Sequence, residues 1–137
     1  MTGTLAPGCS RTVLLHPEIS RATIVQYAGA SGDYNPLHHD EPYAVERAGY
    51  SSVIAHGMFT MGLSARLVTD LVGVESLREY AGRFHAPVVP GDALTGTVTL
   101  TGTTPSATGV LHCFEVQTLN QHGQLIFSGT AVAELPA

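Results

Sequence analysis

The sequence has no lysine and few charged residues of any kind. Only 12% of its 137 residues are charged, and all six basic residues are arginines. The net charge is −5, and no basic run is present that could follow a phosphate backbone. This composition argues against nucleic acid as a partner. So small a charged fraction also predicts that part of the surface is hidden in an oligomer.

Cysteine is scarce, and long hydrophobic runs are missing. The two cysteines, Cys9 and Cys113, form no CxxC pair, which favours free thiols in a reducing compartment. The first residues lack the basic start and continuous apolar run of a signal peptide. The longest apolar segment, near residues 57–73, is interrupted by Arg66 and Asp70 and is too short to span a bilayer. We therefore expect a cytoplasmic protein with no membrane partner.

The order of helical and strand patterns predicts an α+β fold. We expect one domain over residues 1–137, with residues 1–10 flexible because they are rich in Gly, Pro and Ser. The pattern predicts a short strand at 11–15, helices at 20–32, 40–49 and 57–72, and strands at 78–89, 93–102, 109–120 and 124–135. Turn residues between the later strands indicate an antiparallel sheet. The last helix is apolar nearly all round, so the sheet should wrap around it.

The segment ASGDYNPLHHDEPYA, residues 30–44, gathers most of the polar side chains that can carry chemistry. Pro36 stands between Asp33 and His38 and breaks regular structure, so a bent loop can point both side chains at one spot. A carboxylate beside an imidazole can move protons near neutral pH. Such a pair can hold one water and deliver its hydroxide and proton to neighbouring carbons, or run the reverse.

The second candidate element is His56-Gly57 at the start of the apolar helix. A helix N-terminus presents unpaired N–H groups and a partial positive charge. Because Gly57 has no side chain to block a carbonyl oxygen, its N–H can act as an oxyanion-hole donor, which is typically worth about 3 kcal/mol of barrier. A proton shuttle beside such a donor favours chemistry next to a carbonyl group.

Other interpretations of the cluster stay open on composition alone. A loop rich in Asp, Asn and Pro is often only a turn with helix caps. Asp33, His38 and His39 could instead bind a metal, although adjacent histidines seldom converge on one ion and no HExxH spacing is present. A serine nucleophile is disfavoured because no serine stands in a GxSxG setting.

Two stretches, SGDYNPLHHDEPYA and IAHGMFTMGLSARLV, closely resemble the hydratase motif of MaoC-like proteins, which include (R)-specific enoyl-CoA hydratases. The later RFHAPVVPGDALTGTV is similar to a strand-and-turn segment of that family, so the resemblance covers about residues 18–100. It implies a hot-dog fold, in which a curved antiparallel sheet wraps a long central helix. It also implies a homodimer or higher homo-oligomer, or a heterodimer.

The resemblance also implies a reaction and a set of site residues. The family's catalytic Asp and His fall on Asp33 and His38, and its helix-start Gly falls on Gly57. The implied reaction is reversible hydration of a trans-2-enoyl thioester to a (3R)-3-hydroxyacyl thioester carried by coenzyme A or acyl carrier protein. No cofactor or metal is implied, because the thioester itself acidifies the C2 hydrogen.

Further residues are predicted to bind the substrate. They are Asn35, which would also brace the loop, His56, Met58, Phe59 and Arg83. Arg83 is a candidate for the anionic carrier of a coenzyme A substrate.

One departure from the family and two alternative functions accompany this prediction. A supporting serine found in the central helix of some relatives is not assigned here, and Ser64 is the nearest serine to its place. The alternatives are an acyl thioesterase on the same fold and a non-catalytic acyl-binding subunit.

Overall fold

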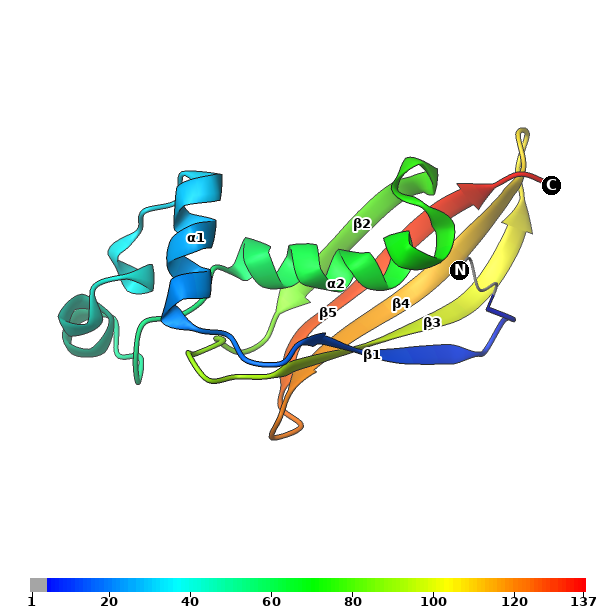
Figure 1. Cartoon of the computed structure of the whole chain (residues 1–137). Helices are drawn as coiled ribbons and strands as arrows, with labels where there is room; N and C mark the ends of the chain where they lie inside the picture. The colour runs from blue at the N-terminus through cyan, green and yellow to red at the C-terminus, as the bar shows by residue number, and fades with distance from the viewer. Residues whose placement is uncertain (1–4) are drawn as a thin grey trace.

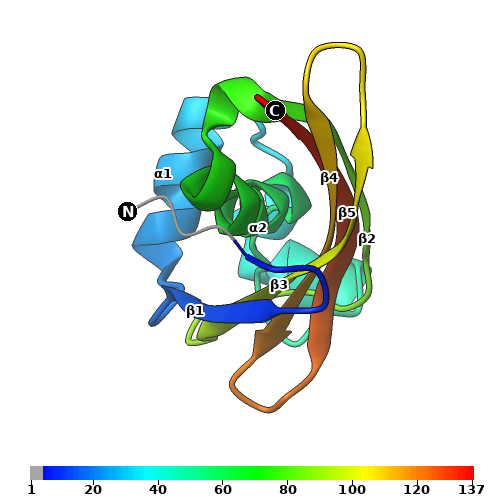
Figure 2. The same ribbon diagram turned by 90° about the vertical axis from the view of Figure 1, so that its right-hand side faces the viewer.

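The computed structural model describes residues 5–137, which form one curved sheet with a long helix across its inner face (Figures 1 and 2). The strand order in the sheet is β1-β3-β4-β5-β2, and each neighbouring pair is antiparallel. The strands are β1 (Ser10–His16), β2 (Leu77–Phe84), β3 (Leu94–Pro105), β4 (Val110–Asn120) and β5 (Leu125–Leu135). The α-helices are α1 (Arg21–Ser31) and α2 (Gly57–Val72). This is the α+β arrangement that the sequence predicts.

Strand β3 shows why the sheet has one buried face. Leu94, Gly96, Val98 and Leu100 are buried, and the threonines between them are partly exposed. Because successive side chains of a strand point to opposite faces, the apolar set faces α2 and the threonines face outward.

Helix α2 lies against this apolar face. Its buried residues recur every three or four positions and so share one side of the helix; they are Thr60, Ser64, Leu67, Val68 and Leu71. Arg66 Nη2 lies 3.7 Å from Asp70 Oδ2, and both side chains are more than half exposed, so these two residues lie on the solvent-facing side of the helix. The curved sheet lies against the buried side of this helix, which is the sheet-around-helix arrangement that the sequence predicts.

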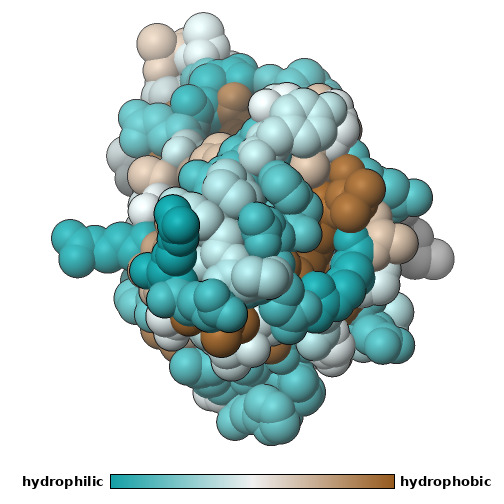
Figure 3. Space-filling model, turned by 90° about the vertical axis from the view of Figure 1, so that its left-hand side faces the viewer, coloured by the Kyte–Doolittle hydropathy of each residue, from teal (hydrophilic) through white to brown (hydrophobic). Residues whose placement is uncertain are grey.

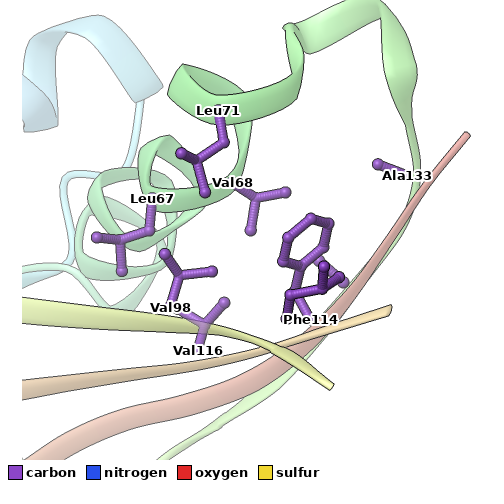
Figure 4. Close-up of a cluster of buried hydrophobic side chains, with 9 residues drawn as sticks. Leu67, Val68, Leu71, Val98, Phe114, Val116 and Ala133 are labelled. Atoms are coloured by element: carbon purple, nitrogen blue, oxygen red, sulfur yellow. The ribbon is translucent and has the colours of Figure 1, made fainter. Parts of the chain in front are cut away.

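The main core lies between α2 and the centre of the sheet (Figure 4). Leu67, Val68 and Leu71 of α2 contact buried residues of β3, β4 and β5. Burying a side chain of this size typically contributes about 1.5–3 kcal/mol. This packing fixes the position of α2 over the sheet and therefore the position of its N-terminus.

Strand β2 forms one edge of the sheet and is tied to α2 by a partly buried tyrosine. Tyr80 O–H donates to the Met61 carbonyl (2.9 Å), and burial raises the pKa of Tyr80 well above its ordinary value. The strand ends at Phe84, before the predicted end at residue 89. The chain then turns inward, and Ala55 N–H donates to the Val88 carbonyl (2.8 Å).

Helix α1 and the segment after it form one end of the molecule, on the left in Figure 1. Helix α1 confirms the helix predicted at 20–32: Ser20 Oγ caps it by accepting from Thr23 N–H (3.0 Å), and Gly32 ends it with a φ of 73°. The surface of this end is mostly hydrophilic with a few hydrophobic patches (Figure 3). Within the helix predicted at 40–49, the structure has a π-helical segment, η2 (Tyr43–Arg47). At its end, Ala48 N–H donates a hydrogen bond to the Tyr43 carbonyl.

The N-terminal segment was expected to be flexible over residues 1–10, and residues 1–4 of it lie outside the described residues. Gly8 N–H donates to the Leu100 carbonyl (2.7 Å), and Leu100 N–H donates to the Cys9 carbonyl (3.1 Å), so the backbone already pairs with β3 just before β1 begins. Within residues 5–137, no helix combines the length and the apolar character that crossing a membrane requires.

Candidate active site

The loop after α1 is folded by hydrogen bonds of its own side chains. Asp33 Oδ1 accepts from Asn35 N–H (3.2 Å), and Asn35 Oδ1 accepts from Leu37 N–H (3.0 Å). Asp and Asn favour such local bonds in turns. Pro36 then opens the short 3-10 helix η1 (Pro36–His38). Asn35 therefore braces the loop so that Asp33 and His38 face each other.

Asp33 and His38 form an open pair with unequal exposure. Asp33 Oδ2 lies 3.8 Å from His38 Nε2, and the two side chains are 53% and 9% exposed. This separation is too long for a direct hydrogen bond. Two polar atoms each about 2.8 Å from one water oxygen can lie this far apart, so the pair is able to bind a shared water.

A backbone carbonyl sets the tautomer of His38. His38 Nδ1 lies 2.7 Å from the Ile54 carbonyl oxygen. A carbonyl oxygen only accepts, so Nδ1 must carry the proton and donate it. In the neutral ring Nε2 then holds a lone pair on the side of Asp33, which is the arrangement a general base needs.

His56 lies beneath this pair and is almost fully buried, with 2% of its surface exposed. Its Nε2 lies 3.0 Å from the Asp33 carbonyl oxygen, and its ring stacks on the His38 ring with centroids 3.7 Å apart and planes at 22°. His56 Nδ1 is buried and has no hydrogen-bond partner among residues 5–137. The sequence placed His56 near the site but did not show that it touches both Asp33 and His38.

Gly57 follows His56 as the first residue of α2. Phe59 N–H and Thr60 N–H both donate to the His56 carbonyl, whereas the Gly57 N–H has no hydrogen-bond partner in the described part of the chain. An N–H at this position is one of the donors that a helix start leaves unpaired. It is therefore available to a ligand oxygen and lies in the positive field of the helix end.

A cavity of about 340 Å³ opens beside Gly57. Its walls come from the segment before α2, the start of α2, the end of β2 with the turn after it, and β5; they include Tyr50, Ala55, Thr60, Phe84 and Ile126. The Phe84 ring, half exposed, lies over Gly57. The apolar walls and the free N–H suit an acyl chain with a carbonyl at its head.

The structure does not bring every predicted residue to this place. Met58 is 60% exposed and does not line the cavity. The Phe59 ring packs against Tyr27, with centroids 5.3 Å apart, on the side of α1. Arg83 lines a shallow hollow of about 540 Å³ with Glu115 and other outward residues, on the face of the sheet opposite α2. The proposed substrate-binding roles of these three residues remain predictions.

The arrangement also bears on metal binding. Among the described residues, Asp33, His38 and His56 offer ligand atoms within 4.8 Å of one another. A histidine nitrogen binds a metal in the plane of its ring, and nearly parallel rings 3.7 Å apart cannot both direct lone pairs at one ion. His39, the other predicted ligand, turns away, since its Nε2 lies 3.0 Å from the Tyr34 carbonyl. The stacked geometry therefore disfavours a metal and favours proton chemistry.

Ser64 has a different set of partners. It is fully buried, and its Oγ lies 2.8 Å from the Thr60 carbonyl and 2.6 Å from Thr118 Oγ1 on β4. Its hydroxyl thus joins α2 to the sheet, and its contacts do not include Asp33 or His38.

Several contributors to the site were missed by sequence reasoning. The Ile54 carbonyl and the cavity residues Tyr50 and Thr60 carry no local signal for their roles. Phe84 carried a weak sequence signal for its place on the cavity wall, because alternation along β2 puts its side chain on the same face as Tyr80 and Gly82.

Comparison with known proteins agrees with the fold. A family model described as MaoC like domain matches residues 7–120. The chain is 38% identical to an (R)-specific enoyl-CoA hydratase of Rhodospirillum rubrum over 87% of this chain and 81% of the relative. It is 27% identical to a mitochondrial 3-hydroxyacyl-[acyl-carrier-protein] dehydratase of Arabidopsis thaliana, covering 93% of this chain and 81% of the relative. The solved structure of an (R)-hydratase from A. caviae involved in PHA biosynthesis superposes with a TM-score of 0.76 at 27% identity, covering 97% of this chain and 98% of that one.

Proposed function

The chain belongs to the MaoC-like family, and on this premise we propose that it catalyses the reversible hydration of a trans-2-enoyl thioester to a (3R)-3-hydroxyacyl thioester. Hydration and dehydration are the reactions named for its relatives, which makes it a hydro-lyase. The hot-dog fold is shared with the solved hydratases. The substrate, its stereochemistry and the residue roles that follow are our proposal.

One observation carries the proposal: the Asp33–His38 pair stands beside a helix start whose Gly57 N–H is unpaired. His38 Nε2, with its lone pair free, takes one proton from a water that Asp33 Oδ2 helps to orient. The water oxygen bonds to C3 of the enoyl thioester, and a proton passes from the pair to C2. One water is consumed, and His38 returns to its starting state.

The Gly57 N–H supports the charge that develops during this step. Addition at C3 moves electron density from the carbon–carbon double bond onto the thioester oxygen. A donor aimed at that oxygen stabilises the enolate-like transition state, and losing one such donor typically costs 10²–10³-fold in rate. The cavity beside Gly57 would receive the acyl chain, with coenzyme A or acyl carrier protein outside it. In the dehydration direction the same groups remove the C2 proton and protonate the departing hydroxyl.

The test uses crotonyl-CoA and follows the loss of enoyl-thioester absorbance. We expect activity in the wild-type protein and a fall of roughly 10²-fold or more in Asp33→Asn and in His38→Ala. His39→Ala is the matched control, because His39 is the adjacent histidine, is exposed, and its Nε2 lies 3.0 Å from the Tyr34 carbonyl. Chiral analysis of the product then tests the (3R) assignment.

Three outcomes would contradict the proposal. Activity that survives both Asp33→Asn and His38→Ala removes the proposed mechanism. Release of free thiol without hydration would point instead to the thioesterase. A protein inactive on enoyl-CoA and on enoyl-acyl-carrier-protein substrates would support the non-catalytic alternative.

A further inference from the structure

We propose that His56 is a positioning residue that holds the Asp33–His38 pair at its working separation and couples it to the Gly57 N–H. Its Nε2–H donates to the Asp33 carbonyl (3.0 Å), and its ring supports the His38 ring at a centroid distance of 3.7 Å. For its kinetic consequences this inference rests on the proposed function. The sequence predicted that His56 contacts the substrate directly; we now propose that it acts indirectly, through Asp33 and His38.

The burial of His56 suits this role better than contact with a ligand. The Tyr27 ring of α1 packs against another side of the His56 ring, with centroids 4.8 Å apart. Only 2% of the His56 surface is exposed. The titratable groups that face it are Tyr27, Asp33 of the loop and His38 of η1. An imidazole enclosed in this way has little freedom to move, so it can act as a fixed support.

His56 also links a rigid element to an exposed one. It is the N-terminal cap residue of α2, which the core holds over the sheet, whereas Asp33 lies in a loop with its side chain 53% exposed. The hydrogen bond to the Asp33 carbonyl ties that loop to the helix. Because Gly57 is the next residue, the same tie fixes the water-binding pair relative to the oxyanion donor.

The hydrogen bonds require opposite tautomers in the two stacked rings. The Ile54 carbonyl places the proton of His38 on Nδ1, and the Asp33 carbonyl places the proton of His56 on Nε2. The other ring nitrogen of His56, Nδ1, is buried and has no hydrogen-bond partner among residues 5–137.

Two substitutions separate the hydrogen bond from the ring. His56→Phe keeps a flat ring against His38 but lacks the donor, whereas His56→Gln places a side-chain N–H near the position of Nε2 and lacks the ring. We expect His56→Phe to lower kcat by 10- to 100-fold with KM changed less than about threefold, because a shift of about 1 Å in catalytic groups can cost 10²-fold. We expect His56→Gln to recover most of that loss.

His39→Phe is the matched control, since His39 Nε2 also bonds a carbonyl of the same loop, that of Tyr34, but its ring does not contact His38. It should keep wild-type kcat. Wild-type kcat in His56→Phe, or an equal loss in His39→Phe, would overturn the inference. So would a His56→Gln variant as slow as His56→Phe while both remain folded by circular dichroism.

A spectroscopic measurement tests the inference without any turnover. Long-range ¹H–¹⁵N spectra of the wild-type protein at neutral pH distinguish the two tautomers of each histidine. We expect the Nδ1–H form for His38 and the Nε2–H form for His56; the reverse assignment for His56 would overturn the inference even if His56→Phe fails to fold. If the wild-type protein is inactive on every enoyl thioester, the proposed function fails, whereas these tautomers still decide whether His56 holds the loop.

Discussion

A Cβ atom at position 57 would lie 3.2 Å from the nearest ring carbon of Phe84. Gly57 has ordinary helical geometry and no positive φ, so an alanine fits the backbone. Phe84 is half exposed, and its ring can give way by the few tenths of an ångström that are needed. We therefore expect glycine at this residue to matter for access to its N–H, on the wall of the cavity, more than for folding.

We expect Gly57→Ala to stay folded and to lose about tenfold or more in kcat/KM, because the methyl group stands where the thioester carbonyl approaches. Gly62→Ala, on the same helix, is the control, since a Cβ there meets nothing within 4 Å. The control should keep full activity and gain up to about 1 kcal/mol of stability from helix propensity. Thermal unfolding and the crotonyl-CoA assay measure both effects; a fully active Gly57→Ala would remove the oxyanion role.

At the scale of the elements, polar contacts join strands that are distant in sequence. Glu134 near the end of β5 accepts hydrogen bonds from Thr108 and from Ser106 (2.7 Å) of the turn between β3 and β4, and from Arg78 Nε of β2 (3.3 Å). The Thr108 and Ser106 bonds, with a smaller contribution from Arg78, hold the pKa of Glu134 below its ordinary value. This carboxylate thus links three parts of the sheet at one end.

The pKa shift predicts a pH dependence of stability. A group whose pKa is lower in the folded state stabilises the protein above the unfolded pKa, about 4.3 for Glu, and loses that effect as the pH falls through the folded pKa. Glu134→Gln should therefore melt below the wild type at pH 7, and the difference should shrink as the pH falls below the ordinary pKa of Glu. Glu115→Gln is the control, because no described residue bonds the Glu115 side chain. A gap in melting temperature that does not change with pH would contradict the assignment.

At the scale of the whole molecule, the distribution of exposed apolar side chains bears on assembly. Met58 is 60% exposed and Phe84 50% exposed, at the start of α2 and the end of β2 around Gly57. Strand β2 is an edge of the sheet, and exposed edges readily pair with another chain. The low charged fraction of the sequence points in the same direction.

We therefore expect the protein in solution to contain at least two chains. Light scattering coupled to size exclusion measures the mass directly. Phe84→Glu should reduce the mass toward that of one chain by placing a charge in the interface, whereas Leu14→Glu, exposed on the other edge strand β1, should leave it unchanged. A single-chain mass for the wild-type protein at micromolar concentration would contradict the expectation.

How far the sequence predicted the protein differs between its local and its long-range features. The cap at Ser20, the stop at Gly32 and the alternation of β3 follow from residues close together in the chain, and the structure contains them. The end of β2 at Phe84 was predicted too late, because the inward turn that follows depends on a bond between Ala55 and Val88. Local patterns do not report such distant partners.

The sequence by itself determined the family and supplied the chemical groups of the candidate site, because Asp33, His38 and Gly57 stand in short motifs whose residue types suit the proposed chemistry. Only the tertiary structure decided how those groups are supported. The Ile54 carbonyl sets the tautomer of His38, and His56 ties the Asp33 loop to α2. Each of these bonds joins segments whose approach depends on the packing of α2 against the sheet, and a hydrogen bond between such segments exists only once that packing has formed.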